Sequence, residues 1–212
     1  GAQDMHSDPS KVVELPNGNL RIYEKQKYYP PIGSLLSSKG DREKDRYAPA
    51  FDFKECQNIT LNNVTVHHAL GMAYLFERSE NIKITDCKVV LPPNSNRVIS
   101  STADATHFAN CKGDILIEGC TFENMLDDGT NVHGTYVEIN KIIDSKTIRV
   151  ALKHFEQTGF KFAAPGDEVW FIKHPSPARA ETNTVSNVKV LNETYMDLTF
   201  ENAIPSDLKK GD

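Results

Sequence analysis

The sequence predicts an all-β protein in which a parallel β-helix of about three coils is followed by a small antiparallel β-barrel or sandwich. Three observations support this fold class. A nine-residue pattern occurs three times between residues 58 and 122, and a short apolar run precedes each copy. Beyond Gly134 the period is lost, and five short strand-like runs follow one another between turn signals.

The nine-residue pattern begins at Asn58, Asn81 and Asp114, so its copies start 23 and 33 residues apart. Each copy reads polar, apolar, x, apolar, x, x, apolar, x, apolar. Two short strands that meet at a corner, with alternate residues pointing inward, would produce this order. We expect Asn58 and Asn81 to stack at equivalent turns. The predicted inward stacks are Ile59, Ile82 and Ile115; Leu61, Ile84 and Ile117; Val64, Cys87 and Cys120; and Val66, Val89 and Phe122.

The apolar runs at residues 50–53, 73–76 and 105–108 would form a third face of each coil. Three faces per coil are typical of a parallel β-helix. The longer interval between the second and third copies contains residues 91–97, which we interpret as a loop that projects from the coil. An antiparallel sandwich of short strands is the alternative.

These patterns divide the chain at residues 47 and 135. In residues 1–47, runs at 11–15 and 19–24 flank a Pro-Asn-Gly turn and fit a hairpin, and the charged residues 38–46 read as a solvated loop. Residues 48–135 form the solenoid, and residues 136–212 the antiparallel domain. We expect that last domain to be truncated and the chain to be a fragment, because a three-coil solenoid without a cap is unstable. The predicted strands of the antiparallel domain are 136–143, 147–152, 168–172, 185–191 and 194–200.

Composition excludes several classes of partner. The net charge is −5, and Lys and Arg are scattered, which argues against a nucleic-acid partner and favours a neutral or polar substrate. No apolar run approaches the roughly 18 residues of a membrane span. The four cysteines show no CxxC spacing and are expected to be free core thiols; a bridge between Cys87 and Cys120 is the alternative.

The stretch between residues 101 and 134 combines aspartates with two histidines and two cysteines. Asp104 precedes the pair Asp127 and Asp128 by 23 and 24 residues, and His107 and His133 follow the two acidic sites. This interval is about one coil, and neighbouring coils stack at about 4.8 Å, so we expect Asp104 to face one of the pair. Two nearby carboxyl groups can act as acid and base in glycoside hydrolysis; they are about 6.5–9.5 Å apart in inverting enzymes and about 5–5.5 Å apart in retaining ones.

Residues 103–108, 110–113 and 126–134 resemble the signature of glycoside hydrolase family 110, the bacterial α-1,3-galactosidases. The resemblance implies a right-handed β-helix with inserted β-barrel domains, and an exo-acting enzyme that releases terminal α-1,3-linked galactose with inversion and without a metal or other cofactor. It also implies a carbohydrate substrate and a secreted or periplasmic protein whose signal peptide lies outside this chain. The layout is more distantly similar to polygalacturonases of family 28, but Ala103 stands where their motif has Thr.

Matching motif to motif places Asp104, Asp127 and Asp128 on the family's active-site aspartates. We assign Asp127 and Asp128 to base and water-positioning work, and Asp104 to the general acid or to a second water ligand. The predicted substrate-binding residues are Arg97, His107, Asn131 and His133. Because the family's domain is far longer than this chain, further catalytic residues can lie outside it, and the activity of the fragment alone is left open.

Simpler interpretations remain for several of these residues. Asp127-Asp128-Gly129 could be a turn whose carboxylates cap backbone amides, and the two histidines could be bonded to the backbone. Trp170 could be a sugar platform, but we expect it in the core of the antiparallel domain. A metal site is not expected, because no tight ligand spacing occurs. At the level of the whole protein, a polysaccharide lyase and a non-catalytic glycan-binding module are the alternatives.

Overall fold

The computed structural model describes residues 9–25, 29–37, 48–154, 157–176 and 179–212, which belong to two compact units, residues 1–38 and 39–212. These described residues contain no α-helix. Accordingly, none of them forms a helix with the length and apolar character needed to cross a bilayer. The all-β fold class is therefore confirmed, and the charged segment at 38–46 lies outside the described residues.

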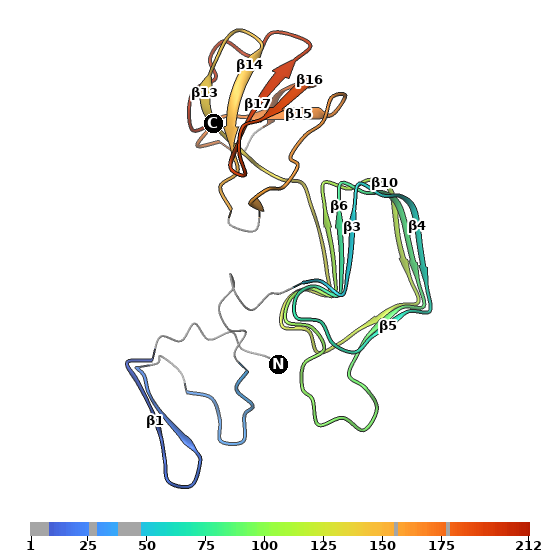
Figure 1. Cartoon of the computed structure of the whole chain (residues 1–212), viewed down its shortest axis with the longest axis vertical. Helices are drawn as coiled ribbons and strands as arrows, with labels where there is room; N and C mark the ends of the chain where they lie inside the picture. The colour runs from blue at the N-terminus through green and yellow to red at the C-terminus, as the bar shows by residue number, and fades with distance from the viewer. Residues whose placement is uncertain (1–8, 26–28, 38–47, 155–156, 177–178) are drawn as a thin grey trace. The chain divides into compact units, whose positions relative to one another are not determined.

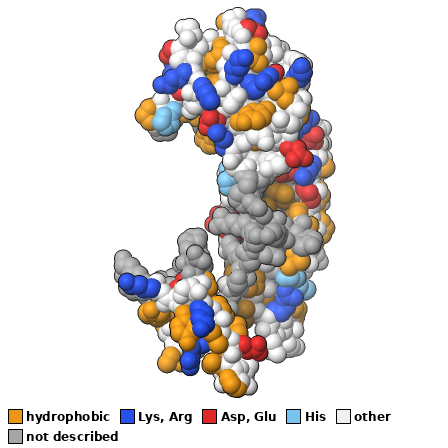
Figure 2. Space-filling model, turned by 60° about the vertical axis from the view of Figure 1, so that its left-hand side comes forward, with side chains coloured by type: hydrophobic (Ala, Val, Ile, Leu, Met, Phe, Trp, Pro, Cys, Tyr) orange, Lys and Arg blue, Asp and Glu red, His pale blue; other side chains and the backbone are white. Residues whose placement is uncertain are grey.

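The first unit contains the predicted hairpin. Strand β1 (Lys11–Glu14) pairs with β2 (Leu20–Tyr23) in an antiparallel register, and the turn between them includes Gly18 at φ 78°. Its apolar side chains are largely exposed, with Leu20 at 63% and Ile22 at 43%. Hydrophobic side chains are among those exposed on the face of the molecule that Figure 2 shows. The hairpin therefore has no core of its own.

The second unit begins with stacked coils built from three parallel sheets (Figure 1). The first sheet has the order β12-β9-β6-β3, the second β10-β7-β4 and the third β11-β8-β5. Every strand in them pairs with a strand about one coil away, which is the arrangement of a parallel β-helix. The strands are β3 (Phe51–Lys54), β6 (Tyr74–Glu77), β9 (Thr106–Ala109) and β12 (Thr130–His133); β4 (Gln57–Asn62), β7 (Glu80–Thr85) and β10 (Lys112–Glu118); and β5 (Thr65–Val66), β8 (Lys88–Val89) and β11 (Thr121–Phe122).

The core of the coils consists of columns of like residues. Ile82 pairs with Ile59 on one side and with Ile115 on the other, as the repeated pattern predicts. In the first sheet the ring of Phe76 stacks on Phe53 at 5.0 Å and on Phe108 at 4.8 Å between centroids, and Phe76 is fully buried. Burial of one such side chain contributes about 1.5–3 kcal/mol, so these columns hold the coils together.

An asparagine occupies the same corner in each of the first two coils. Asn58 and Asn81 both adopt φ 56°, a left-handed conformation that Asn tolerates better than most residues. Asn81 Nδ2 donates to Asn58 Oδ1 at 3.4 Å, which confirms the predicted stack. In the third coil Gly113 takes this place at φ 65°, because a Cβ there would lie 2.2 Å from Asn81 Oδ1.

The antiparallel part forms one five-stranded sheet in the order β13-β14-β17-β16-β15. All five predicted strands are present. Strand β16 begins at Arg179 rather than at residue 185, because its first half pairs with β15 and its second half with β17. The sheet buries a second core that includes Ile148, Leu198 and Phe200. The strands are β13 (Glu138–Ile142), β14 (Thr147–Ala151), β15 (Glu168–Ile172), β16 (Arg179–Val190) and β17 (Tyr195–Phe200).

Two details extend or correct the expectations from sequence. All four cysteines are free thiols, as expected. Trp170, expected in the core, is 47% exposed, because the alternation of β15 turns its neighbour Phe171 inward instead. The division of the chain at residues 47 and 135 stays a prediction.

Candidate active site

Coiling brings the three predicted aspartates together. Thr106 in β9 pairs with Thr130 in β12, a register that sets Asp104 beside Asp128, and the Ala105 amide donates to the Asp128 carbonyl at 2.9 Å. One carboxylate oxygen from each of Asp104, Asp127 and Asp128 lies within 4.8 Å of the others. Asp104 and the adjacent pair of aspartates one coil later therefore form one cluster at the corner where β9 and β12 begin.

The three aspartates differ in burial and in partners. Asp104 is buried, with 4% of its surface exposed, whereas Asp127 and Asp128 are exposed. Both oxygens of Asp104 accept hydrogen bonds: Oδ2 from Nδ1 of His107 at 2.7 Å, and Oδ1 from the Asp128 amide at 3.2 Å. The local arrangement thus fixes one carboxylate and presents two to solvent.

A hydrogen-bonded chain runs from Asp104 through two histidines to the backbone. His107 Nε2 lies 2.8 Å from His133 Nε2, and His133 Nδ1 donates to the Gly134 carbonyl at 2.8 Å. The chain engages all four ring nitrogens of His107 and His133 and so fixes the orientation of both rings beside the exposed carboxylates.

A pocket of about 790 Å³ is lined by His107, whose Nδ1 binds Asp104 of this cluster. Its floor is the outward face of the first sheet, from which His107, Asn131 and His133 project. Its other wall comes from the antiparallel part through Gln157 and Phe160. A volume of this size is in the usual range for small-molecule sites, about 300–1,000 Å³.

The structure gathers six of the seven predicted site residues at this cluster and pocket. Arg97 is the exception: its guanidinium contacts the ring of His68, and it does not line the pocket. The wall contributed by Gln157 and Phe160 carries no signal in the sequence, because nothing local links residues 157–160 to a sheet some fifty residues earlier. The oxygens of the three aspartates are also close enough to ligate a hard cation, for which carboxylates are suitable ligands.

Stacked parallel coils with an acidic cluster and a pocket on the outer face define a parallel β-helix protein with a surface site. Residues 147–212 match the family model described as GLAA-B beta-barrel domain II. The alpha-1,3-galactosidase A of Shewanella woodyi is 33% identical over 201 residues, which cover 95% of this chain and 32% of that protein.

Two further relatives are named alpha-1,3-galactosidase B. That of Akkermansia muciniphila is 34% identical over 171 residues, or 81% of this chain and 22% of that protein. That of Phocaeicola vulgatus is 40% identical over 142 residues, or 66% of this chain and 24% of that protein. The chain therefore belongs to the family of the alpha-1,3-galactosidases A and B, and it spans about a third or less of the length of these relatives.

Proposed function

We propose that this chain carries the acidic centre of an exo-acting glycoside hydrolase, an α-1,3-galactosidase that releases terminal α-1,3-linked galactose from glycans with inversion. The observation that carries the proposal is the convergence of Asp104, Asp127 and Asp128 from neighbouring coils to within 4.8 Å. The names of the relatives support galactose as the sugar. Because such glycans lie outside cells, we also propose a secreted or periplasmic protein.

The burial of the carboxylates supports a division of roles. Asp104 is buried and both of its oxygens are engaged, so it suits a second water ligand better than a proton donor to a leaving group. Asp127 and Asp128 are exposed and can reach substrate. We therefore propose that one of this pair protonates the leaving oxygen and that the other, with Asp104, activates water.

Inversion in this proposal rests on the family resemblance. The cluster's oxygens lie within 4.8 Å, which is shorter than the roughly 6.5–9.5 Å between acid and base in inverting enzymes. The 4.8 Å limit joins one oxygen from each residue, so the separation between acid and base depends on which oxygens of the three carboxylates act. The anomer released first, followed by proton NMR during hydrolysis, decides between inversion and retention.

Sugar binding is assigned to the pocket beside the cluster. His107, Asn131 and His133 project from adjacent strands into one pocket. The Asn131 amide can hydrogen-bond sugar hydroxyls there, and the two imidazole rings, whose nitrogens bind Asp104, each other and Gly134, shape the pocket beside it. Arg97 stays a prediction as a substrate contact. We also propose that residues 48–135 supply the catalytic coils and that residues 136–212 form a separate antiparallel domain.

The test is an assay of the full-length protein on a panel of α-galactosides. We expect free galactose from α-1,3-linked substrates, and loss of that release in Asp104→Asn, Asp127→Asn and Asp128→Asn. A lyase would instead give unsaturated products that absorb in the ultraviolet. A glycan-binding module would bind the same substrates without turnover, and normal turnover in all three variants would refute the assignment.

A further inference from the structure

A row of three coil corners contacts the segment that leads from β14 to β15. Glu55, Arg78 and Asn110 follow β3, β6 and β9 at equivalent positions, and all three have φ between 50° and 52°. Each side chain contacts the segment: Glu55 binds Lys161, and Arg78 and Asn110 bind the Phe162 carbonyl. The segment that forms one wall of the pocket is therefore attached along one edge of the first sheet.

Arg78 makes the most buried of these attachments, with only 8% of its side chain exposed. Its Nη1 donates to the Phe162 carbonyl at 3.0 Å, and its Nη2 donates to Asp167 Oδ2 at 2.7 Å. Its Nε is buried with no hydrogen-bond partner among the described residues. Nε also lies 3.9 Å from Glu55 Oε1, within ion-pair distance. A buried guanidinium costs free energy unless it is paired, so its contacts with Phe162, Asp167 and Glu55 offset that cost.

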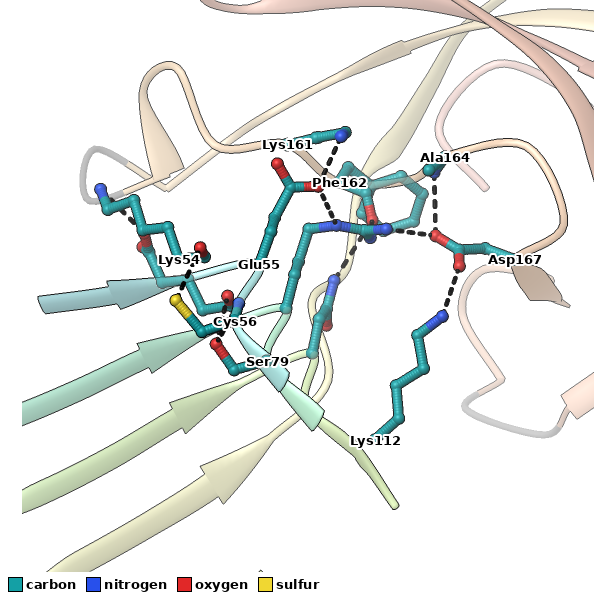
Figure 3. A network of polar contacts seen from close by, with 12 residues as sticks. Lys54, Glu55, Cys56, Ser79, Lys112, Lys161, Phe162, Ala164 and Asp167 are labelled. Carbon is teal, nitrogen blue, oxygen red and sulfur yellow. Dashed lines mark hydrogen bonds and ion pairs between the residues drawn. The ribbon is translucent and has the colours of Figure 1, made fainter. Parts of the chain in front are cut away.

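Asp167 is the acidic partner of Arg78 on the segment that leads to β15. It accepts hydrogen bonds from Lys112 Nζ at 3.1 Å and from the Ala164 amide at 2.8 Å, as Figure 3 shows. Burial opposes its ionisation, but the bonds from Arg78, Ala164 and Lys112 outweigh that effect and lower the pKa of Asp167. The carboxylate is therefore held in its charged form, the form that binds Arg78.

The part of this segment that lines the pocket beside His107 has the mixture of apolar and polar side chains that a sugar-binding surface needs. His154, Gln157, Thr158 and Phe160 line the same pocket as His107 and His133, so the wall combines the apolar ring of Phe160 with the polar side chain of Gln157. The pocket volume of about 790 Å³ exceeds what one monosaccharide fills. The wall is therefore placed to meet the part of a glycan that follows the terminal galactose.

We propose that Arg78 is a positioning residue that holds the wall formed by His154, Gln157, Thr158 and Phe160 against the pocket, and that this wall binds the sugar next to the terminal galactose. The inference rests on the proposed function and adds a subsite to it. Arg78 acts through the segment and need not touch substrate. Its loss should weaken binding of extended glycans more than it slows the chemical step.

The experiment compares Arg78→Met and Arg78→Lys in the full-length protein, with Arg149→Met as the matched control. Arg149 also forms an arginine–carboxylate pair, with Asp197 at 2.7 Å, but within the antiparallel sheet. Two substrates are used: an aryl α-galactoside, which has no second sugar, and an α-1,3-linked galactosyl oligosaccharide. Hydrogen–deuterium exchange of the amides in 157–164 is measured in each variant.

We expect Arg78→Met to speed exchange in 157–164 and to raise KM for the oligosaccharide about tenfold, with kcat within about twofold. KM for the aryl galactoside should change little, Arg78→Lys should be intermediate, and Arg149→Met should leave both readouts unchanged. Equal KM changes for the two substrates would overturn the subsite, and unchanged exchange would overturn the positioning role. If Arg78→Met does not fold, Asp167→Asn carries the same test.

The two proposals can fail separately. If the wild-type protein releases no galactose, the proposed function fails, whereas exchange and calorimetric binding of the same oligosaccharide still report on Arg78. Weaker oligosaccharide binding in Arg78→Met, with unchanged binding of free galactose, would support the inference in that case. Equal binding by the variant and the wild type would overturn it.

Discussion

The backbone amide of Asp128 donates a hydrogen bond to Oδ1 of Asp104 at 3.2 Å, although the two residues are 24 positions apart in the chain. Stacking of coils at the strand spacing brings them together. The buried carboxylate is thus held by the backbone of the corner that carries the exposed pair. The distance between acidic groups is therefore set by the register of β9 and β12, and side-chain rotamers adjust it only locally.

Replacement of Asp128 by Asn tests the proposed chemistry most directly. The amide retains the size of the carboxylate and leaves the Asp128 backbone bond to Asp104 in place. The amide can neither give up nor accept a proton as a catalytic acid or base does, so we expect galactose release by the full-length protein to fall by about 10²–10⁴-fold. Asp114→Asn, an exposed aspartate elsewhere on the coils, is the control and should keep normal turnover. Equal rates for the two variants would remove Asp128 from the mechanism.

The series of hydrogen bonds from Asp104 through His107 and His133 to Gly134 predicts that two substitutions of His107 reduce activity to different extents. Asparagine can place a donor where Nδ1 of His107 meets Asp104, but it cannot reach His133, and alanine can do neither. We expect His107→Asn to retain more activity than His107→Ala, with kcat of the alanine variant lower by about 10²-fold. Identical losses in the two variants would indicate that the contact with Asp104 is unimportant.

The cluster also predicts how the protein responds to chelation. Although oxygens of three aspartates lie within 4.8 Å, the proposed mechanism uses them for proton transfer and water positioning. We therefore expect exhaustive dialysis against EDTA to leave the rate of galactose release unchanged, and added Ca²⁺ or Mg²⁺ to have no effect. A rate that falls on dialysis and returns with one cation would instead assign the cluster to a metal.

Much of the coil architecture could be predicted because the inward-facing positions of a β-helix recur in the sequence at intervals of about one coil. Each inward column is a short-range pattern repeated at one-coil intervals, so Ile59, Ile82 and Ile115 could be aligned without a structure. The fourth strand of the first sheet, β12, was missed because it has no further copy of the pattern after it. The match of Thr106-x-Phe108 to Thr130-x-Val132 is the signal that could have found it.

The site was predictable only in part, for a related reason. Asp104 and Asp128 are joined by coil register, which the spacing shows. The wall from Gln157 to Phe160 depends on contacts between distant segments, such as that of Arg78 with Asp167, 89 positions apart. Ion pairs of this kind follow from no local periodicity. The same limit applies to Trp170, whose exposure depends on which face of β15 meets the second core.

The phenylalanine column predicts a steep dependence of stability on burial. Phe76 is fully buried between Phe53 and Phe108, whereas Phe51 is 37% exposed at the edge of the same sheet. We expect Phe76→Ala to lower the free energy of unfolding by about 3–5 kcal/mol, and Phe51→Ala to lower it by much less. Urea denaturation followed by circular dichroism measures both. Comparable losses would mean that the column does not act as a close-packed core.

The contacts of Asp167 predict that the free energy of unfolding falls at acid pH, because they attach the pocket wall to the coils. Because hydrogen bonds outweigh burial and lower its pKa below the ordinary value of about 3.9, the charged form is favoured in the folded protein. Its contribution is therefore fully present above about pH 4 and is lost as pH falls through the folded pKa. Asp167→Asn should lower the free energy of unfolding at pH 7 by about 2 kcal/mol, the scale of hydrogen bonds to a charged group.

The difference between the wild type and Asp167→Asn isolates this residue from other carboxylates. Asp197 and Glu55 also have lowered pKa values, through hydrogen bonds from Arg149 and Lys161, so the wild type loses stability in acid for several reasons. Those losses are common to both proteins and cancel in the difference. Thermal unfolding between pH 7 and about pH 2 should show a constant difference in melting temperature above about pH 4 and convergence of the two melting temperatures below it. A difference that stays constant over that range would mean that Asp167 acts through packing, and that its charge does not hold Arg78.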